Sequence, residues 1–258
     1  MTILSDHVTG YLEALRAERG PVMAEMEQLA ERDGVPIVHW ETGRMLAALC
    51  RALDPVVLEV GTAIGYSTLH MAEQLERGRV VTLELDPDRA AQARDFLGRA
   101  GVADRVEIVE GDARETIGSL AGPFDLLFVD GTKTEYRDYV DLALPKLSER
   151  ALLVVDNLLM GGDVALPEGE ATSWNPDSVA AARVLNAELL SDARWVGCVL
   201  PVGDGIGLAA RACAAPPAGR RRRRSAGGAP CSPRLPRRAS CGRPRPGIDG
   251  TALRRSRR

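Results

Sequence analysis

The sequence contains very little lysine and few aromatic residues. Lysine and arginine together number 33, yet only Lys133 and Lys146 are lysines, and aromatic residues make up 4% of the chain. No apolar run approaches the roughly 18 residues that a membrane-spanning helix requires. The N-terminus also lacks the basic segment followed by an apolar block that is typical of a signal peptide. We therefore expect a cytoplasmic protein without a membrane partner.

Closely spaced cysteine pairs are absent as well. None of the five cysteines forms a Cys-X-X-Cys pair, and three of them lie after residue 212. This pattern argues against a disulfide framework and fits a reducing compartment. With 258 residues, the chain is long enough for one α/β domain with a sizeable core.

Charge is distributed unevenly along the chain. Residues 213–258 contain fourteen arginines and one aspartate, so the net charge of -3 conceals an acidic segment over residues 1–212. This tail cannot bury enough apolar surface to offset the entropy lost on ordering. We predict a folded domain over 1–212 and a disordered tail over 213–258 that is extraneous to the fold. The tail could bind RNA through phosphate charge, but it has no aromatic residue to stack on bases, so nucleic acid is not the partner we expect.

Strands and helices alternate from Asp54 onward. The predicted strands are Val56–Val60, Arg79–Glu84, Arg105–Val109, Phe124–Val129 and Ala151–Val155, and the predicted helices between them are Tyr66–Glu76, Pro87–Arg99, Arg114–Leu120 and Tyr136–Leu147. Continuous apolar strands joined by amphipathic helices indicate a parallel sheet covered on both faces. Right-handed crossovers then place every loop that follows a strand on one edge of the sheet.

The regions on either side of this alternation are expected to add helices and a hairpin. Helical spacing indicates two helices within residues 6–32 and a third over Glu41–Leu53. After a helix over Ser178–Leu190, the segments Trp195–Leu200 and Gly205–Ala210 are joined by a short Gly/Asp link, which is typical of an antiparallel hairpin.

A glycine turn follows the first predicted strand. Gly61 and Gly65 bracket a junction at which a ligand can approach free backbone N–H groups. Glu84 ends the next strand, where an acidic side chain can accept hydrogen bonds from ribose hydroxyls, although it could also simply cap the strand. Glu59 beside the loop suits a cationic ligand such as S-adenosylmethionine. The loop is not Gly-X-Gly-X-X-Gly, which disfavours the alternative of a nicotinamide-dependent oxidoreductase.

Three oxygen-bearing side chains follow two further predicted strands. Asp130 ends the fourth strand, and Asp156 and Asn157 end the fifth, a composition that suits Mg²⁺ if the strands are neighbours. Ordinary turns are the alternative, since Asp-Gly and Asp-Asn are common turn formers. Lys133 lies three residues after Asp130. A lysine in so arginine-rich a chain indicates an amine that can lose its proton and act as a base, the alternative being a solvated surface lysine.

The ordered set of motifs resembles the cation-dependent O-methyltransferases, the family of catechol and caffeoyl-CoA O-methyltransferases and their bacterial relatives. The likeness covers about residues 3–211. It is carried by Leu58-Glu59-Val60-Gly61-Thr62 with Gly65-Tyr66-Ser67, Thr82-Leu83-Glu84-Leu85-Asp86-Pro87, Gly111-Asp112-Ala113, Phe128-Val129-Asp130-Gly131-Thr132-Lys133-Thr134-Glu135-Tyr136, Val155-Asp156-Asn157 and Leu200-Pro201-Val202-Gly203-Asp204-Gly205. Gly131-Thr132 departs from the Ala-Asp or Ala-Glu that relatives often have there.

The resemblance implies a fold and a site. The fold is a Rossmann-like three-layer α/β sandwich with a seven-stranded, mostly parallel sheet whose last strand is antiparallel. Implied S-adenosylmethionine contacts are Val38, Glu59, Gly61, Ser67, Glu84, Ala113 and Asp130, to which we add Thr62 of the glycine loop and Asp112 after the third strand. Implied metal ligands are Asp130, Asp156 and Asn157, with Lys133 as the catalytic base. The variable segment Leu158–Pro176 should line the acceptor site.

We therefore predict transfer of a methyl group from S-adenosylmethionine to a phenolic oxygen of a small catechol-like molecule. Two vicinal oxygens of the acceptor would chelate Mg²⁺, or another divalent cation such as Mn²⁺ or Ca²⁺, which lowers the pKa of the attacking hydroxyl. An RNA-modifying methyltransferase that uses the basic tail is the main alternative. We also expect a homodimer.

Overall fold

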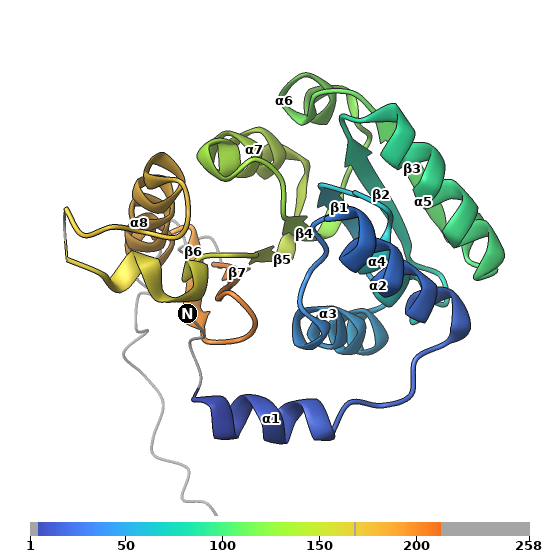
Figure 1. Ribbon diagram of the computed structural model, residues 1–258. Helices are drawn as coiled ribbons and strands as arrows, with labels where there is room; N and C mark the ends of the chain where they lie inside the picture. The colour runs from blue at the N-terminus through green and yellow to red at the C-terminus, as the bar shows by residue number, and fades with distance from the viewer. Residues whose placement is uncertain (1–4, 168, 213–258) are drawn as a thin grey trace, which may run out of the picture. The chain divides into compact units, whose positions relative to one another are not determined.

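The computed structural model describes residues 5–167 and 169–212, and within them seven strands form a single sheet (Figure 1). The predicted disordered tail over 213–258 lies outside the described residues, so the domain boundary stays a prediction. The strands are β1 (Val56–Val60), β2 (Arg79–Glu84), β3 (Val106–Glu110), β4 (Phe124–Val129), β5 (Leu147–Val155), β6 (Trp195–Leu200) and β7 (Ile206–Arg211). Their order in the sheet is β3-β2-β1-β4-β5-β7-β6.

Eight α-helices lie within the described residues. They are α1 (Asp6–Ala14), α2 (Pro21–Asp33), α3 (Trp40–Leu53), α4 (Tyr66–Ala72), α5 (Pro87–Arg99), α6 (Ala113–Thr116), α7 (Tyr136–Ala143) and α8 (Pro176–Ser191). Short 3₁₀ helices occupy Ala103–Arg105, Ile117–Ser119, Lys133–Glu135, Leu144–Lys146 and Met160–Ala165. None of the helices in this part of the chain has the length and apolar character needed to cross a membrane.

The two faces of the sheet build two separate hydrophobic clusters. Side chains alternate between the faces along each strand, so Leu127 and Val129 pack with α7 and α8 while Leu126 and Phe128 pack with α3, α4 and α5. This arrangement confirms the predicted three-layer sandwich. The first five strands run parallel, and β7 is antiparallel to both β5 and β6, as predicted for the last strand.

Several predicted boundaries differ from the structure. The helix predicted over Tyr136–Leu147, for example, ends as an α-helix at Ala143 and continues as a 3₁₀ turn over Leu144–Lys146. Strand β5 begins at Leu147, four residues before the predicted start, because Leu147 pairs with Phe124 across an irregularity in the β4–β5 register. Helix α4 ends at Ala72 rather than at Glu76, and α6 continues only as a 3₁₀ turn. Apolar periodicity does not register such local changes in hydrogen bonding.

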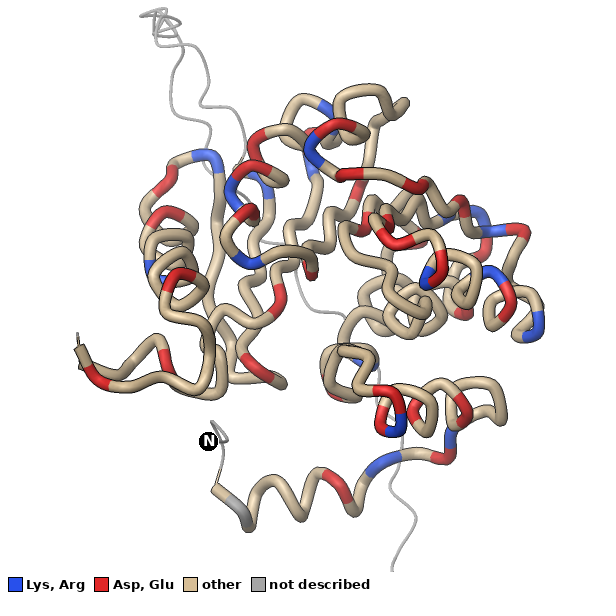
Figure 2. Tube along the Cα trace, turned by 45° about the horizontal axis from the view of Figure 1, so that its top comes forward, with Lys and Arg blue, Asp and Glu red and all other residues tan. Residues whose placement is uncertain are grey.

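Acidic and basic residues are interspersed over the outer helices (Figure 2). Several of them pair between elements, such as Arg99 of α5 with Glu25 of α2 and Arg94 of α5 with Glu110 of β3. These exposed pairs each contribute little to stability, on the order of 0–1 kcal/mol. The fold is therefore held mainly by the two apolar clusters.

Candidate active site

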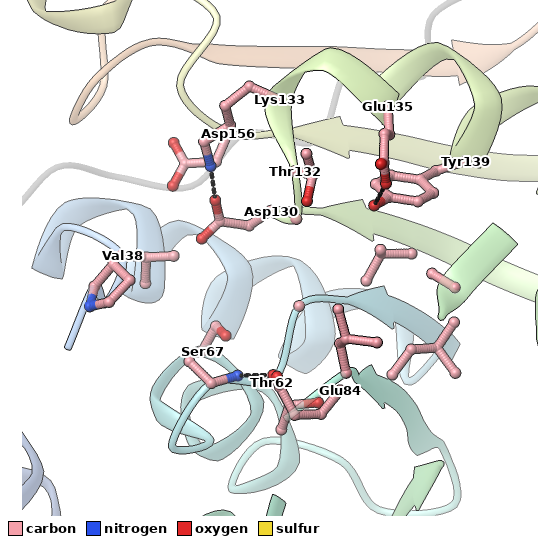
Figure 3. Close-up of a pocket in the computed structure, with 18 of the residues that line it drawn as sticks. Val38, Thr62, Ser67, Glu84, Asp130, Thr132, Lys133, Glu135, Tyr139 and Asp156 are labelled. Atoms are coloured by element: carbon pink, nitrogen blue, oxygen red, sulfur yellow. Dashed lines mark hydrogen bonds and ion pairs between the residues drawn. The ribbon is translucent and has the colours of Figure 1, made fainter. Parts of the chain in front are cut away.

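A cavity of about 670 Å³ opens at the carboxyl ends of β1, β2, β3, β4 and β5 (Figure 3). In open parallel sheets, ligands bind at this edge, at the point where the strand order changes direction. Here that point lies between β1, which is followed outward by β2 and β3, and β4, which is followed outward by β5. The predicted site residues that line the cavity are Val38, Gly61, Thr62, Ser67, Glu84, Asp112, Ala113, Asp130, Lys133, Asp156 and Asn157. Side chains from six separate stretches of sequence thus meet in one place.

The glycine turn forms one wall of the cavity. Gly61 has a φ of 99° and Gly65 a φ of 87°, both in the left-handed region that favours glycine. The Gly61 and Thr62 N–H groups donate to the Leu83 carbonyl at 3.0 and 3.2 Å, which ties the turn to the end of β2. Gly65 then caps the N-terminus of α4.

Glu59 lies behind this wall, fully buried, and does not line the cavity. Its two carboxylate oxygens accept hydrogen bonds from the Ser67 hydroxyl at 2.6 Å and from the Thr68 hydroxyl at 2.5 Å. Burial raises the pKa of Glu59 to about 7, although these hydroxyls oppose the shift. In this structure Glu59 therefore orients Ser67, which faces the cavity (Figure 3).

Glu84 lines the cavity and also holds the glycine turn. One of its oxygens accepts the Ala63 N–H at 2.7 Å and the other accepts the Asp86 N–H at 2.9 Å. Each carboxylate oxygen can accept more than one hydrogen bond, so Glu84 can bind the turn and a ligand hydroxyl together. The strand-cap and ligand-binding interpretations of this residue are compatible.

Asp130 and Asp156 lie side by side because they end neighbouring strands. Val129 is the register partner of Val155, and the Asp156 N–H donates to the Val129 carbonyl at 3.0 Å. Asp156 is 1% exposed and Asn157 8% exposed, and Asn157 takes a left-handed φ of 60°. The ends of these two strands are thus adjacent, as predicted.

These carboxylates suit a cation. Burial raises the pKa of Asp130, and burial followed by the charge of Asp130 raises the pKa of Asp156 to about 7. A bound cation would relieve this cost, because opposite charge favours the ionised form. Among the described residues, no three His, Cys, Asp or Glu side chains are arranged to hold a metal. The predicted set is instead two aspartates with the Asn157 amide, hard oxygen donors that fit Mg²⁺.

Lys133 is held against the same group of residues. Its ammonium lies 2.6 Å from Asp130 Oδ1 and 5.2 Å from the centre of the Tyr136 ring. The side chain is 18% exposed, so the alternative of a solvated surface lysine is not what the structure shows. Figure 3 shows Lys133, Asp130 and Asp156 grouped on one side of the cavity, with Ser67, Thr62 and Glu84 on the other.

Two groups of lining residues lie outside the predicted catalytic, cofactor and metal residues. Glu135 accepts from the Tyr139 hydroxyl and pairs with Arg114, which also binds Asp112. The second group is His39, Trp174 and Asp204. Trp174 belongs to the segment Leu158–Pro176, which was expected to line the acceptor site. His39 had no role assigned from the sequence, and Asp204 appeared there only in the hairpin link and in the motif that carries the family resemblance. The only sequence signal for Asp204 was its position between two glycines, Gly203 and Gly205.

The chain resembles proteins of known type over most of its length. The sequence model of a family described as O-methyltransferase matches residues 16–212. Catechol O-methyltransferase of Mycobacterium tuberculosis is 39% identical over 183 residues, which cover 69% of this chain and 81% of that protein. Caffeoyl-CoA O-methyltransferase of Stellaria longipes is 31% identical over 172 residues, covering 64% and 71%.

A solved structure supports the same relationship. The O-methyltransferase TomG of Streptomyces achromogenes, involved in tomaymycin synthesis and solved in complex with SAM, superposes with a TM-score of 0.70 at 28% identity. The superposition covers 80% of this chain and 96% of TomG.

Proposed function

Because this chain belongs to the O-methyltransferase family, we propose that it transfers a methyl group from S-adenosylmethionine to a phenolic oxygen of a small catechol-like acceptor. We further propose that the reaction depends on a divalent cation, with Mg²⁺ as the first candidate and Mn²⁺ or Ca²⁺ as others. Family membership confirms the predicted methyltransferase activity and leaves the nicotinamide-dependent alternative without support.

One observation carries the proposal of a metal-dependent reaction. The cavity that the glycine turn lines is also lined by the partly buried Asp130 carboxylate, the buried Asp156 carboxylate, the Asn157 amide and the Lys133 amine. Cofactor, cation and acceptor could therefore be held within reach of one another. Such an arrangement brings the acceptor oxygen close to the methyl group, and positioning of this kind supplies much of a transfer rate.

The chain's own residues divide the work between them. Asp130, Asp156 and Asn157 would hold the cation, and Lys133 would take the proton of the acceptor hydroxyl. A bound divalent cation lowers the pKa of a hydroxyl that it contacts, which brings this proton within reach of an amine base. The short contact between Lys133 and Asp130 keeps the amine at the site. The negative charge of Asp130 then balances the positive charge of the ammonium that forms when Lys133 takes the proton.

The charge and size of the cavity favour a cationic cofactor with a small acceptor. Its acidic lining residues are Glu84, Asp86, Asp112, Asp130, Glu135, Asp156 and Asp204, against the basic Arg89, Arg114 and Lys133. An acidic lining suits the sulfonium of S-adenosylmethionine. The cavity must hold the cofactor and the acceptor together, which favours a catechol-sized acceptor over a larger thioester.

The proposal is tested with a panel of acceptors and labelled methyl donor. We expect a catechol to be methylated with Mg²⁺ and a matched phenol with one hydroxyl to be a poor acceptor, because it cannot chelate. Excess EDTA should abolish turnover while S-adenosylhomocysteine still binds in calorimetry. Full activity in EDTA would contradict the cation requirement, and equal rates for both acceptors would contradict chelation.

A further inference from the structure

Two segments from opposite ends of the domain meet beside the cavity. One is Pro36–His39, which precedes α3 and in which all four residues line the cavity. The other is the β6–β7 loop, whose Asp204 also lines it. His39 Nε2 lies 3.2 Å from Asp204 Oδ2, with the two side chains 52% and 27% exposed.

The β6–β7 loop lies directly on the start of α3. A Cβ built on Gly203 would come within 2.9 Å of Thr42 Oγ1 and 3.0 Å of His39 Cβ. Gly203 also has a φ of 54°, in the left-handed region. The absence of a side chain there allows the close approach that brings the Asp204 carboxylate to His39.

The opposite side of this loop is anchored to the strand end that carries Asn157. The Leu159 and Met160 N–H groups donate to the Asp204 carbonyl at 2.9 and 2.8 Å, and the Leu158 N–H donates to the Gly205 carbonyl at 2.8 Å. Asp204 therefore has a fixed backbone. Its side chain can hold His39 without the loop having to reorganise.

We propose that the His39–Asp204 pair is a positioning contact that holds the Pro36–His39 segment against the bound cofactor. This inference rests on the proposed function, because the ligand that it retains is S-adenosylmethionine or its product S-adenosylhomocysteine. Val38 is the predicted cofactor contact of the segment and is 6% exposed. A shift of His39 moves Val38 with it, since the two are adjacent in the chain.

The fold itself does not depend on this pair. Helix α3 is packed through Leu46, Ala47 and Cys50 into the apolar core, and Gly43 lies against the His70 ring. A partly exposed pair of this kind adds little to the stability of the fold. Its loss should weaken S-adenosylhomocysteine binding by about two- to fivefold and leave the unfolding midpoint close to that of the wild-type protein.

The test measures the dissociation constant of S-adenosylhomocysteine by calorimetry for His39→Ala, Asp204→Ala and the double variant. We expect each single variant to bind about two- to fivefold more weakly, and the double variant no more weakly than either, because both remove one contact. His39→Gln keeps an N–H donor and should recover most of the affinity. His7→Ala, at an exposed position in α1, is the matched control.

Unchanged affinity in His39→Ala would overturn the inference, and so would additive losses in the double variant. If His39→Gln and His39→Ala are both folded and bind S-adenosylhomocysteine equally weakly, the hydrogen bond to Asp204 is not what supports cofactor binding. Failure of the wild-type protein to bind S-adenosylhomocysteine would instead overturn the proposed function and this inference with it. The wild-type measurement therefore separates the two.

Discussion

The carbonyl oxygen of Asp130 lies only 2.3 Å from where a Cβ atom on Gly61 would be. The backbone of the glycine turn thus packs directly against the strand end that carries the predicted metal ligand. This contact joins the cavity wall formed by the glycine turn to the wall that carries Asp130 and Lys133. Gly61 also needs its positive φ of 99°, so two separate requirements exclude a side chain at this position.

Gly61→Ala should therefore disrupt the site. Strain from the clash and from the backbone should lower the free energy of unfolding by about 2 kcal/mol or more, and S-adenosylhomocysteine affinity should fall at least tenfold. Denaturant unfolding and calorimetry measure the two effects. Gly98→Ala in α5 is the control, because a Cβ there meets nothing within 4 Å. Wild-type affinity in Gly61→Ala would contradict the close approach.

Lys133→Ala should reduce turnover far more than cofactor affinity. Loss of a positioned general base typically costs about 10²- to 10⁴-fold in rate, and Lys133→Arg should be similarly impaired because arginine stays protonated. Steady-state kinetics with S-adenosylhomocysteine calorimetry separate the two parameters. The chain's other lysine provides the control, since Lys146 donates to the Leu120 carbonyl and does not line the cavity. An active Lys133→Ala variant would remove this residue from the mechanism.

His70 should make stability depend on pH. Burial, with a smaller effect of Arg44, lowers the pKa of His70 to about 4, and its Nε2 is buried with no hydrogen-bond partner among the described residues. The unfolded chain binds a proton near pH 6.5 that the folded chain does not bind until about pH 4. Stability from this group is thus present above pH 6.5 and is lost as pH falls towards 4.

The expected loss from His70 between pH 7 and pH 5 is about 2 kcal/mol. His70→Asn should flatten the pH dependence by that amount in denaturant unfolding, even though it also costs packing at every pH. The exposed variant His7→Asn should retain the wild-type slope. A His70→Asn protein with the same slope as wild type would show that His70 does not carry this dependence.

Removal of residues 213–258 should leave catechol methylation unchanged, because the proposed site lies entirely within residues 36–204. Initial rates of the full chain and of the 1–212 chain measure this. The RNA-modifying alternative predicts instead that RNA methylation occurs and is lost with the tail. Light scattering on both chains tests the predicted homodimer at the same time.

Strand alternation and chemistry at strand ends were readable from the sequence because each depends on local pattern. The apolar run Val56–Val60 before Gly61 predicts a buried strand and a turn, and both are present. Local pattern cannot say which strands are neighbours. Asp130 and Asp156 meet only because the order of the sheet places β4 beside β5.

Residues whose role depends on distant partners could not be assigned in this way. Glu59 was predicted as a cofactor contact, and the packing of α4 places its carboxylate against the Ser67 and Thr68 hydroxyls. His39 and Asp204 are far apart in the chain and carried no joint signal, because hairpin geometry and the close approach at Gly203 bring them together.

The sequence by itself determined the α/β class, the glycine turn, the acidic strand ends and the family, since all of these are encoded by residue type at short spacing. Tertiary structure alone decided which of those side chains face the cavity and which stand behind it. The physical reason is that orientation follows from long-range packing of the sheet against its helices. This packing places Lys133 against Asp130 at the cavity and Glu59 behind the glycine turn.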